Sequence, residues 1–134
     1  MTESPPVVHS ARPTVVGDVC TAIPATGTLP AGIRWRLAES GRQLDANVVH
    51  LLSQQRIDMH TEPDLDVLII VVAGTGILTG SDSALPLAAG SIAWLPHGSA
   101  RSLDAGDDGL SYLTVHPRRP GMQIGHRPGV TDSP

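Results

Sequence analysis

The sequence predicts an all-β barrel or sandwich, and three observations support this fold class. The chain has 134 residues with Gly 14 and Pro 12, which leaves little room for long helices. Short apolar or alternating segments recur roughly every 8–12 residues, with turn signals between them. Hydrophobic residues make up 40% of the chain, but aromatic residues only 2%, so the core must consist of Leu, Ile, Val and Ala. This length predicts a single domain.

The first half of the chain contains four predicted strands. Residues 33–37 (IRWRL) alternate apolar and basic side chains, as a half-buried strand does. Residues 44–52 form the second predicted strand, and residues 57–60 alternate again. Residues 67–72 are apolar throughout, which is typical of a strand covered on both faces.

The next strands are shorter. Residues 73–76 (AGTG) predict a turn, and a strand follows at 77–79. Residues 84–87 predict an edge-like strand, and residues 91–95 predict a strand that Pro96 ends.

The last two predicted strands flank a strong turn signal. Residues 100–103 lead to the glycine- and aspartate-rich turn 106–109 (GDDG), and residues 110–116 close the series. No segment has a convincing helical pattern.

The strands divide the chain into three parts. Residues 1–32, rich in Pro, Thr, Gly and Ala, are expected to form a flexible N-terminal arm. Residues 33–116 form the predicted barrel. Residues 117–134 form a C-terminal tail whose repeated prolines exclude a central strand.

Composition and charge exclude several classes of function. The formal net charge is −4, and the 9 basic residues are all arginines that form no basic stripe, so we expect no nucleic-acid binding. No apolar stretch approaches the roughly 20 residues of a membrane helix, and the first residues lack the pattern of a signal peptide. Cys20 is the single cysteine and cannot form an internal disulfide. We therefore expect a cytoplasmic protein without membrane contact.

Two segments carry recognisable motifs. The segment 90–101 reads GSIAWLPHGSAR, which contains the spacing G-x5-P-x-G without a gap, and the segment 60–74 reads HTEPDLDVLIIVVAG. Together they resemble the two motifs of the cupin superfamily. The resemblance implies a double-stranded β-helix, or jelly-roll barrel, and a homodimer. It also implies a metal at the barrel mouth, held by two histidines and a glutamate of the first motif and a histidine of the second.

The sequence departs from the cupin motifs at the metal ligands. His60 occupies the first histidine position, but Glu62 replaces the second histidine. The motif glutamate falls on Val67 when counted back from the motif's last glycine, and on Asp66 when counted forward from Glu62. Because neighbouring residues of a strand face opposite ways, this difference of one residue matters. Arg101 stands at the last histidine position and has no lone pair to donate.

Two interpretations of this pocket remain open. In the first, Arg101 forms an ion pair with Glu62 and no metal binds. The pair would then either be structural only, or Arg101 would hold the carboxylate or phosphate of a ligand through its planar fork. In the second, Arg101 turns outward and a divalent metal (Fe, Mn, Zn or Ni) binds His60, Glu62, Asp66 and a further ligand such as His116.

Two further residues are candidates for contact with a ligand. Tyr112 shares a strand face with Thr114 and His116, a polar stripe that would line a pocket mouth. Trp94 lies in the second motif, where it would either pack in the core or stack on a ring-shaped ligand.

We therefore predict a small-molecule-binding barrel with a degraded metal site, no certain cofactor and an anionic ligand bound by Arg101, Glu62, His60, Tyr112 and Trp94. Two alternatives remain. One is a metal-dependent enzyme, such as a dioxygenase or isomerase, with a variant His/Glu site. The other is a structural or interaction protein with a vestigial pocket.

Overall fold

The computed structural model describes residues 12–24 and 28–119 of this chain. They contain one short helix and seven strands. The elements in chain order are α1 (Val19–Ala22), β1 (Gly32–Arg36), β2 (Leu44–Leu51), β3 (Arg56–Thr61), β4 (Val67–Thr79), β5 (Ala84–Ala88), β6 (Ile92–Leu95) and β7 (Ala100–Pro117). The remaining residues, which include most of the predicted C-terminal tail and the first part of the predicted arm, lie outside the described residues.

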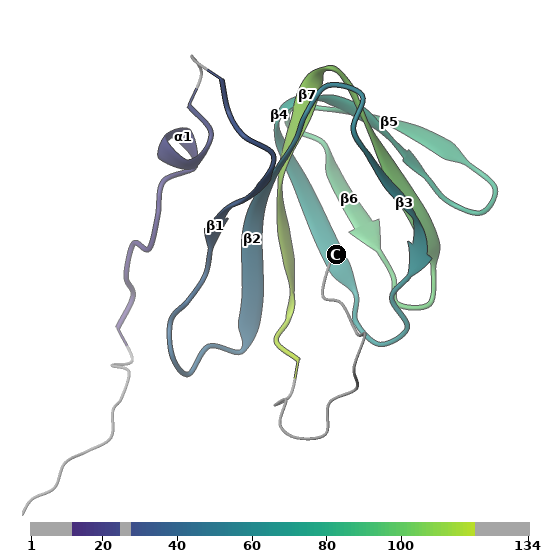
Figure 1. Cartoon of the computed structure of the whole chain (residues 1–134). Helices are drawn as coiled ribbons and strands as arrows, with labels where there is room; N and C mark the ends of the chain where they lie inside the picture. The colour runs from purple at the N-terminus through teal and green to yellow at the C-terminus, as the bar shows by residue number, and fades with distance from the viewer. Residues whose placement is uncertain (1–11, 25–27, 120–134) are drawn as a thin grey trace, which may run out of the picture.

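All strand pairings are antiparallel and belong to one sheet. The main order is β1-β2-β7-β4-β5, while β3 pairs with β7 and β6 pairs with β4. The sheet curves round on itself, so that β3 and β6 lie on the side opposite β1 and β2 (Figure 1). The prediction of an all-β barrel is confirmed.

Two long strands, β4 and β7, differ from the prediction because each replaces two predicted strands. β4 pairs with β7 both along 68–74 and along 76–79, with register shifts near Gly74. Gly74 has a φ of +82° and Gly109 a φ of +79°. A Cβ on Gly74 would overlap the carbonyl oxygen of Gly109, so the two strands cross closely at this point. The segments 73–76 and 106–109, predicted as turns, therefore bend continuous strands, because glycines allow the backbone to bend without interrupting the pairing.

The core fills the barrel interior with alternate residues of each strand. On the inner face of the sheet, Val67, Ile69 and Val71 of β4 lie beside inward-pointing residues of β7 such as Tyr112, and these four residues are buried. Tyr112 is the largest fully buried side chain and has no exposed surface. The rest of the core is aliphatic, as the composition predicts.

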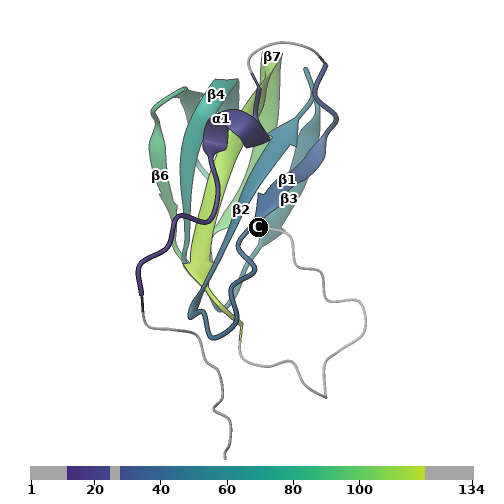
Figure 2. The same ribbon diagram turned by 90° about the vertical axis from the view of Figure 1, so that its left-hand side faces the viewer.

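α1 was not predicted, and it lies across the outer face of β2 and β7 (Figure 2). Asp18 caps this short helix by accepting a hydrogen bond from the backbone N–H of Cys20. The indole of Trp35 donates a hydrogen bond of 3.1 Å to the carbonyl of Val16, which holds the preceding segment against β1. Within residues 12–24 and 28–119, no helix has the length and hydropathy to cross a bilayer.

Candidate functional site

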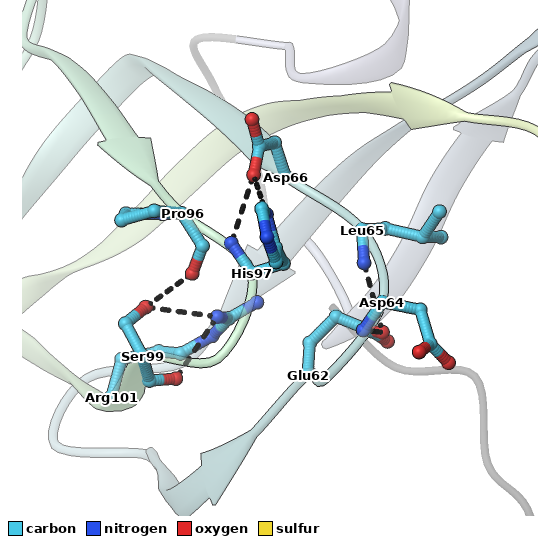
Figure 3. Close-up of polar contacts among 8 residues, drawn as sticks. All are labelled: Glu62, Asp64, Leu65, Asp66, Pro96, His97, Ser99 and Arg101. Atoms are coloured by element: carbon cyan, nitrogen blue, oxygen red, sulfur yellow. Dashed lines mark hydrogen bonds and ion pairs between the residues drawn. The ribbon is translucent and has the colours of Figure 1, made fainter.

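The candidate site is built around Arg101, near the start of β7. Arg101 has the same strand parity as the core residues Leu103 and Ala105, so its side chain projects into the barrel interior, and only 3% of its surface is exposed. Its Nη1 donates hydrogen bonds of 3.2 Å to the carbonyl of Ser99 and 3.3 Å to the Ser99 hydroxyl (Figure 3). Nε and Nη2 are buried and have no hydrogen-bond partner among residues 12–24 and 28–119. The sequence left the direction of Arg101 open, and the structure turns it inward.

Glu62, which the sequence paired with Arg101, instead binds Arg119 and its own loop. Its Oε2 accepts hydrogen bonds from the backbone N–H groups of Asp64 (2.8 Å) and Leu65 (3.2 Å), and its Oε1 accepts one from Nη2 of Arg119. Among the described residues no ion pair joins Glu62 to Arg101, so that part of the first interpretation is wrong. The physical reason is that the chain returns at the end of β7 and brings a second arginine to the buried carboxylate.

The charges of these groups influence one another. Burial raises the pKa of Glu62, but the hydrogen bonds from Asp64, Arg119 and Leu65 outweigh it, and the pKa lies below its ordinary value. Burial also lowers the pKa of Arg101, while the Glu62 carboxylate raises it. Because the pKa of arginine is so high to begin with, Arg101 keeps its positive charge in the interior.

The register question between Asp66 and Val67 is settled by the direction of the two side chains. Val67 is 2% exposed and faces the interior. Asp66 is exposed and turned toward His97, whose backbone N–H and Nδ1 lie 2.8 and 2.7 Å from its Oδ1 (Figure 3). The position of the motif glutamate inside the barrel is therefore apolar.

The four predicted metal ligands do not form a metal-binding set. In the part of the chain that the structure describes, no three His, Cys, Asp or Glu side chains are placed to hold a metal ion. Both oxygens of Glu62 are engaged, and Asp66 binds His97. Nδ1 of His60 lies 2.9 Å from the carbonyl of Asp58, and Nδ1 of His116 lies 2.8 Å from the carbonyl of Pro117, so each Nδ1 already has a partner.

Arg101 adds a further obstacle to a cation. It pairs in register with His60, so its positive charge lies beside the first motif histidine. A guanidinium at this position repels a metal ion and contributes no ligand to it. The residues present therefore do not fit the metal that the cupin motifs imply.

The polar stripe that includes Tyr112 is present, but Trp94 does not belong to the interior. The hydroxyl groups of Tyr112 and Thr114 are buried and have no hydrogen-bond partner among the residues that the structure describes. His116 has the same strand parity at the end of β7 and is partly buried. Trp94 is 66% exposed on the outer face, because its neighbours in β6 take the inward positions. The core role considered for Trp94 is therefore wrong, and its stacking on a ring-shaped ligand stays a prediction.

Sequence reasoning missed two contributors to the site, Arg119 and Ser99. Arg119 lay in the predicted tail, where no local pattern indicates a partner 57 positions away. Ser99 lies between Gly98 of the second motif and Arg101. Its hydroxyl, two positions before the arginine, is the signal that could have identified it as a partner of Arg101.

Comparisons with known proteins support the fold. No protein-family model matches the sequence, and no curated protein matches it significantly. Many solved structures do match. The cupin domain of Cnp3 from Schizosaccharomyces pombe is 12% identical with a TM-score of 0.60, and the match covers 72% of this chain and 67% of that one.

Two further matches are bacterial. A cupin-2 domain protein from Shewanella frigidimarina is 17% identical with a TM-score of 0.53, over 75% of this chain and all (100%) of that one. A sugar phosphate isomerase of the cupin superfamily from Silicibacter pomeroyi is 23% identical with a TM-score of 0.53, over 59% of this chain and only 53% of that one. The motifs, the strand topology and these structures together show that the chain has the cupin fold.

Proposed function

We propose that this protein binds a small anionic molecule inside its barrel, and that Arg101 is the residue that holds it. The observation that carries the proposal is the state of the Arg101 side chain. It is 3% exposed and charged, and in the described part of the chain two of its three nitrogens have no hydrogen-bond partner. A buried charge that is only partly hydrogen-bonded carries an unfavourable desolvation free energy, so such groups in folded proteins are normally paired.

The surrounding charges support an anion. Glu62 is a buried carboxylate that could act as a counter-ion for Arg101, but it already forms an ion pair with Arg119. Asp66 is exposed and binds His97, so it offers Arg101 no counter-ion. An anionic ligand would supply a negative charge to the unpartnered nitrogens of Arg101.

Thermal unfolding in the presence of anions tests the proposal. Acetate, inorganic phosphate and sulfate are each titrated at constant ionic strength into the wild-type protein and into Arg101→Gln. A ligand that binds only the folded state stabilises it by about 2.7 kcal/mol at a hundred times its Kd. We expect at least one anion to raise the Tm of the wild type in a saturable way, and to have no such effect on Arg101→Gln.

A matched control separates the buried arginine from charge in general. Arg34→Gln removes one positive charge from an exposed position of β1 and should leave the anion response unchanged. No saturable response in the wild type, or an equal response in Arg101→Gln, would overturn the proposal and favour a structural or interaction protein with a vestigial pocket.

A metal-dependent enzyme, such as an isomerase, is the second candidate, and the fold is similar to that of the sugar phosphate isomerase from Silicibacter pomeroyi. Such an enzyme would need Glu62 to release its present partners and Arg101 to turn outward. Stoichiometric metal in the wild type, lost in His60→Ala, would support this candidate and reject the proposed one.

A further inference from the structure

We propose a second binding site on the outside of the barrel, for a small uncharged apolar molecule with a single ring. The site is the cavity between residues 16–22, which include α1, and the outer face of β1, β2 and β7 (Figure 2). We call this cavity the outer pocket. It has a volume of about 220 Å³ and contains no residue of the Arg101 site, so it is independent of the anion-binding function.

The floor of the outer pocket consists of outward-facing side chains of three neighbouring strands. Trp35 of β1 pairs in register with Val48 of β2, and Val48 pairs with Leu113 of β7, so the three side chains lie side by side on one face. Ala46 lies two residues before Val48 and faces the same way. Val48 is only 2% exposed although it lies outside the core cluster of the barrel interior. The segment above it therefore covers a second, smaller apolar layer.

The roof of the outer pocket is attached at one end and stands away from the sheet at the other. A Cβ on Gly17 would lie 2.5 Å from Nε1 of Trp35, so the backbone passes directly over the indole. The same indole N–H donates a hydrogen bond of 3.1 Å to the carbonyl of Val16. Beyond this contact the chain turns into α1, which has no buried residue. Val16 and Val19 line the outer pocket and are each 39% exposed, so the contact with the sheet is incomplete.

The lining of the outer pocket selects an uncharged apolar ligand. Its two polar side chains already have partners, since Asp18 accepts a hydrogen bond of 2.8 Å from the backbone N–H of Cys20 and Trp35 donates to Val16. The side chains of the remaining lining residues are aliphatic. Water in a protein cavity needs two to four polar partners, which this lining does not supply. The carboxylate of Asp18 also repels an anion.

The volume of the outer pocket sets the size of the ligand. In another protein, an engineered apolar cavity of about 150 Å³ binds benzene. The outer pocket, at about 220 Å³, has room for one ring with a small substituent. The indole of Trp35 offers an aromatic surface against which such a ring packs.

α1 provides the path of entry. A helix of four residues without a buried side chain adds little stability of its own, so it opens without unfolding of the barrel. A bound ring would contact both the floor and the roof, and would hold residues 16–22 against the sheet. Binding should therefore slow hydrogen exchange at the backbone amides of this segment.

NMR of methyl groups tests the proposal, with toluene and benzoate as probes. We expect toluene to shift the methyl signals of Val48 and Leu113 in a saturable way. The methyl signals of Ile69 and Leu103, which belong to the core cluster inside the barrel, should stay unchanged. Benzoate should bind the outer pocket at least about tenfold more weakly, because its charge would have to leave water beside Asp18.

Two variants change the outer pocket from opposite sides. Ala46→Leu fills it from the floor, and Gly17→Ala forces the roof and the indole of Trp35 apart. Each should weaken toluene binding at least about tenfold, a loss of about 1.4 kcal/mol in binding free energy. Ala84→Leu makes the same substitution as the first variant at an exposed position of β5, and it should bind toluene as the wild type does.

Three results would overturn the proposal. The first is the absence of a saturable shift of the Val48 and Leu113 signals with toluene. The second is tighter binding of benzoate than of toluene at these methyl groups, which would reject an uncharged ligand. The third is unchanged toluene binding in Gly17→Ala, which tests the site even if Ala46→Leu does not fold.

Discussion

Oδ1 of Asp66 binds His97 twice, 2.8 Å from its backbone N–H and 2.7 Å from its Nδ1. This pair joins the loop after β3 to the turn after β6, the two segments that border Arg101 (Figure 3). Asp66, which one count of the motif placed among the metal ligands, therefore lies outside the interior and connects these two segments through His97. It helps to fix the turn from which Ser99 reaches Arg101.

Asp66→Asn should loosen this turn, because an amide oxygen is a weaker acceptor than a carboxylate. We expect faster hydrogen exchange at the backbone amides of His97 and Ser99, with the rest of β7 unchanged. The pKa of Asp66 is lowered, first by the hydrogen bonds from His97. Because this pKa is lowered, the stabilisation from the Asp66–His97 hydrogen bonds is fully present above the ordinary aspartate pKa. It is lost as the pH falls through the pKa of Asp66 in the folded protein. The difference from the wild type should therefore disappear in strong acid. Asp82→Asn, at an exposed loop position, should have no effect at any pH.

Glu62→Gln should destabilise the protein, since it removes the charge that Arg119 and two backbone N–H groups bind. Loss of charge-assisted hydrogen bonds at a buried site costs about 1–3 kcal/mol in the free energy of unfolding, measured by urea denaturation. The pKa of Glu62 is also lowered, so its contribution to the free energy of unfolding is fully present above the ordinary glutamate pKa. This contribution is lost as the pH falls through the pKa of Glu62 in the folded protein. The exposed Glu39→Gln is the control, and an equal effect in both variants would contradict the role of Glu62.

The wild-type protein should acquire no stoichiometric metal. The protein is purified without a tag, incubated with iron, manganese, zinc and nickel, and analysed by elemental mass spectrometry. We expect sub-stoichiometric metal in every case and no change in His60→Ala, because Arg101 and the engaged oxygens of Glu62 leave no suitable ligand set. A one-to-one metal content that falls in His60→Ala would show that the degraded motif still binds metal.

Gly74→Ala and Gly90→Ala should differ strongly in stability although both glycines have a positive φ. Gly90, at +95°, has open space where a Cβ would lie, so its variant carries only backbone strain of about 1–2 kcal/mol. Gly74, at +82°, faces the carbonyl of Gly109, and its variant must also separate β4 from β7. We expect Gly74→Ala to lose several times more stability in urea unfolding, or to fail to fold. Equal losses would contradict the close crossing of the two strands.

The resemblance to cupins also predicts a homodimer. Ile92 (69% exposed), Trp94 (66%) and Leu68 (39%) are apolar and lie together on the outer face of β4 and β6. Light scattering should give the mass of a dimer, and Trp94→Gln should shift it toward the monomer, because Trp is a frequent anchor of interfaces. Ile33→Gln, on β1, is the control. A monomer mass for the wild type would contradict the prediction.

Much of the fold was predictable because its signals are local. The alternation of residues 33–37, the apolar run at 67–72 and the stop at Pro96 each depend on residues a few positions apart. The spacing from Gly90 to Arg101 identified the fold family for the same reason. The bends at Gly74 and Gly109 were predicted as turns, since a glycine-rich segment has the same local pattern whether the strand ends or bends.

The site depended on contacts that no local pattern contains. The sequence by itself determined that a metal position had become an arginine, Arg101, and that a carboxylate, Glu62, stood near the first motif histidine. Only the tertiary structure decided that Glu62 pairs with Arg119, that Val67 rather than Asp66 faces inward, and that one edge of Arg101 has no partner. The physical reason is that the partner of a charged side chain is set by strands that meet in space after distant parts of the chain have folded together. The kind of residue at each position, by contrast, is already present in the linear sequence.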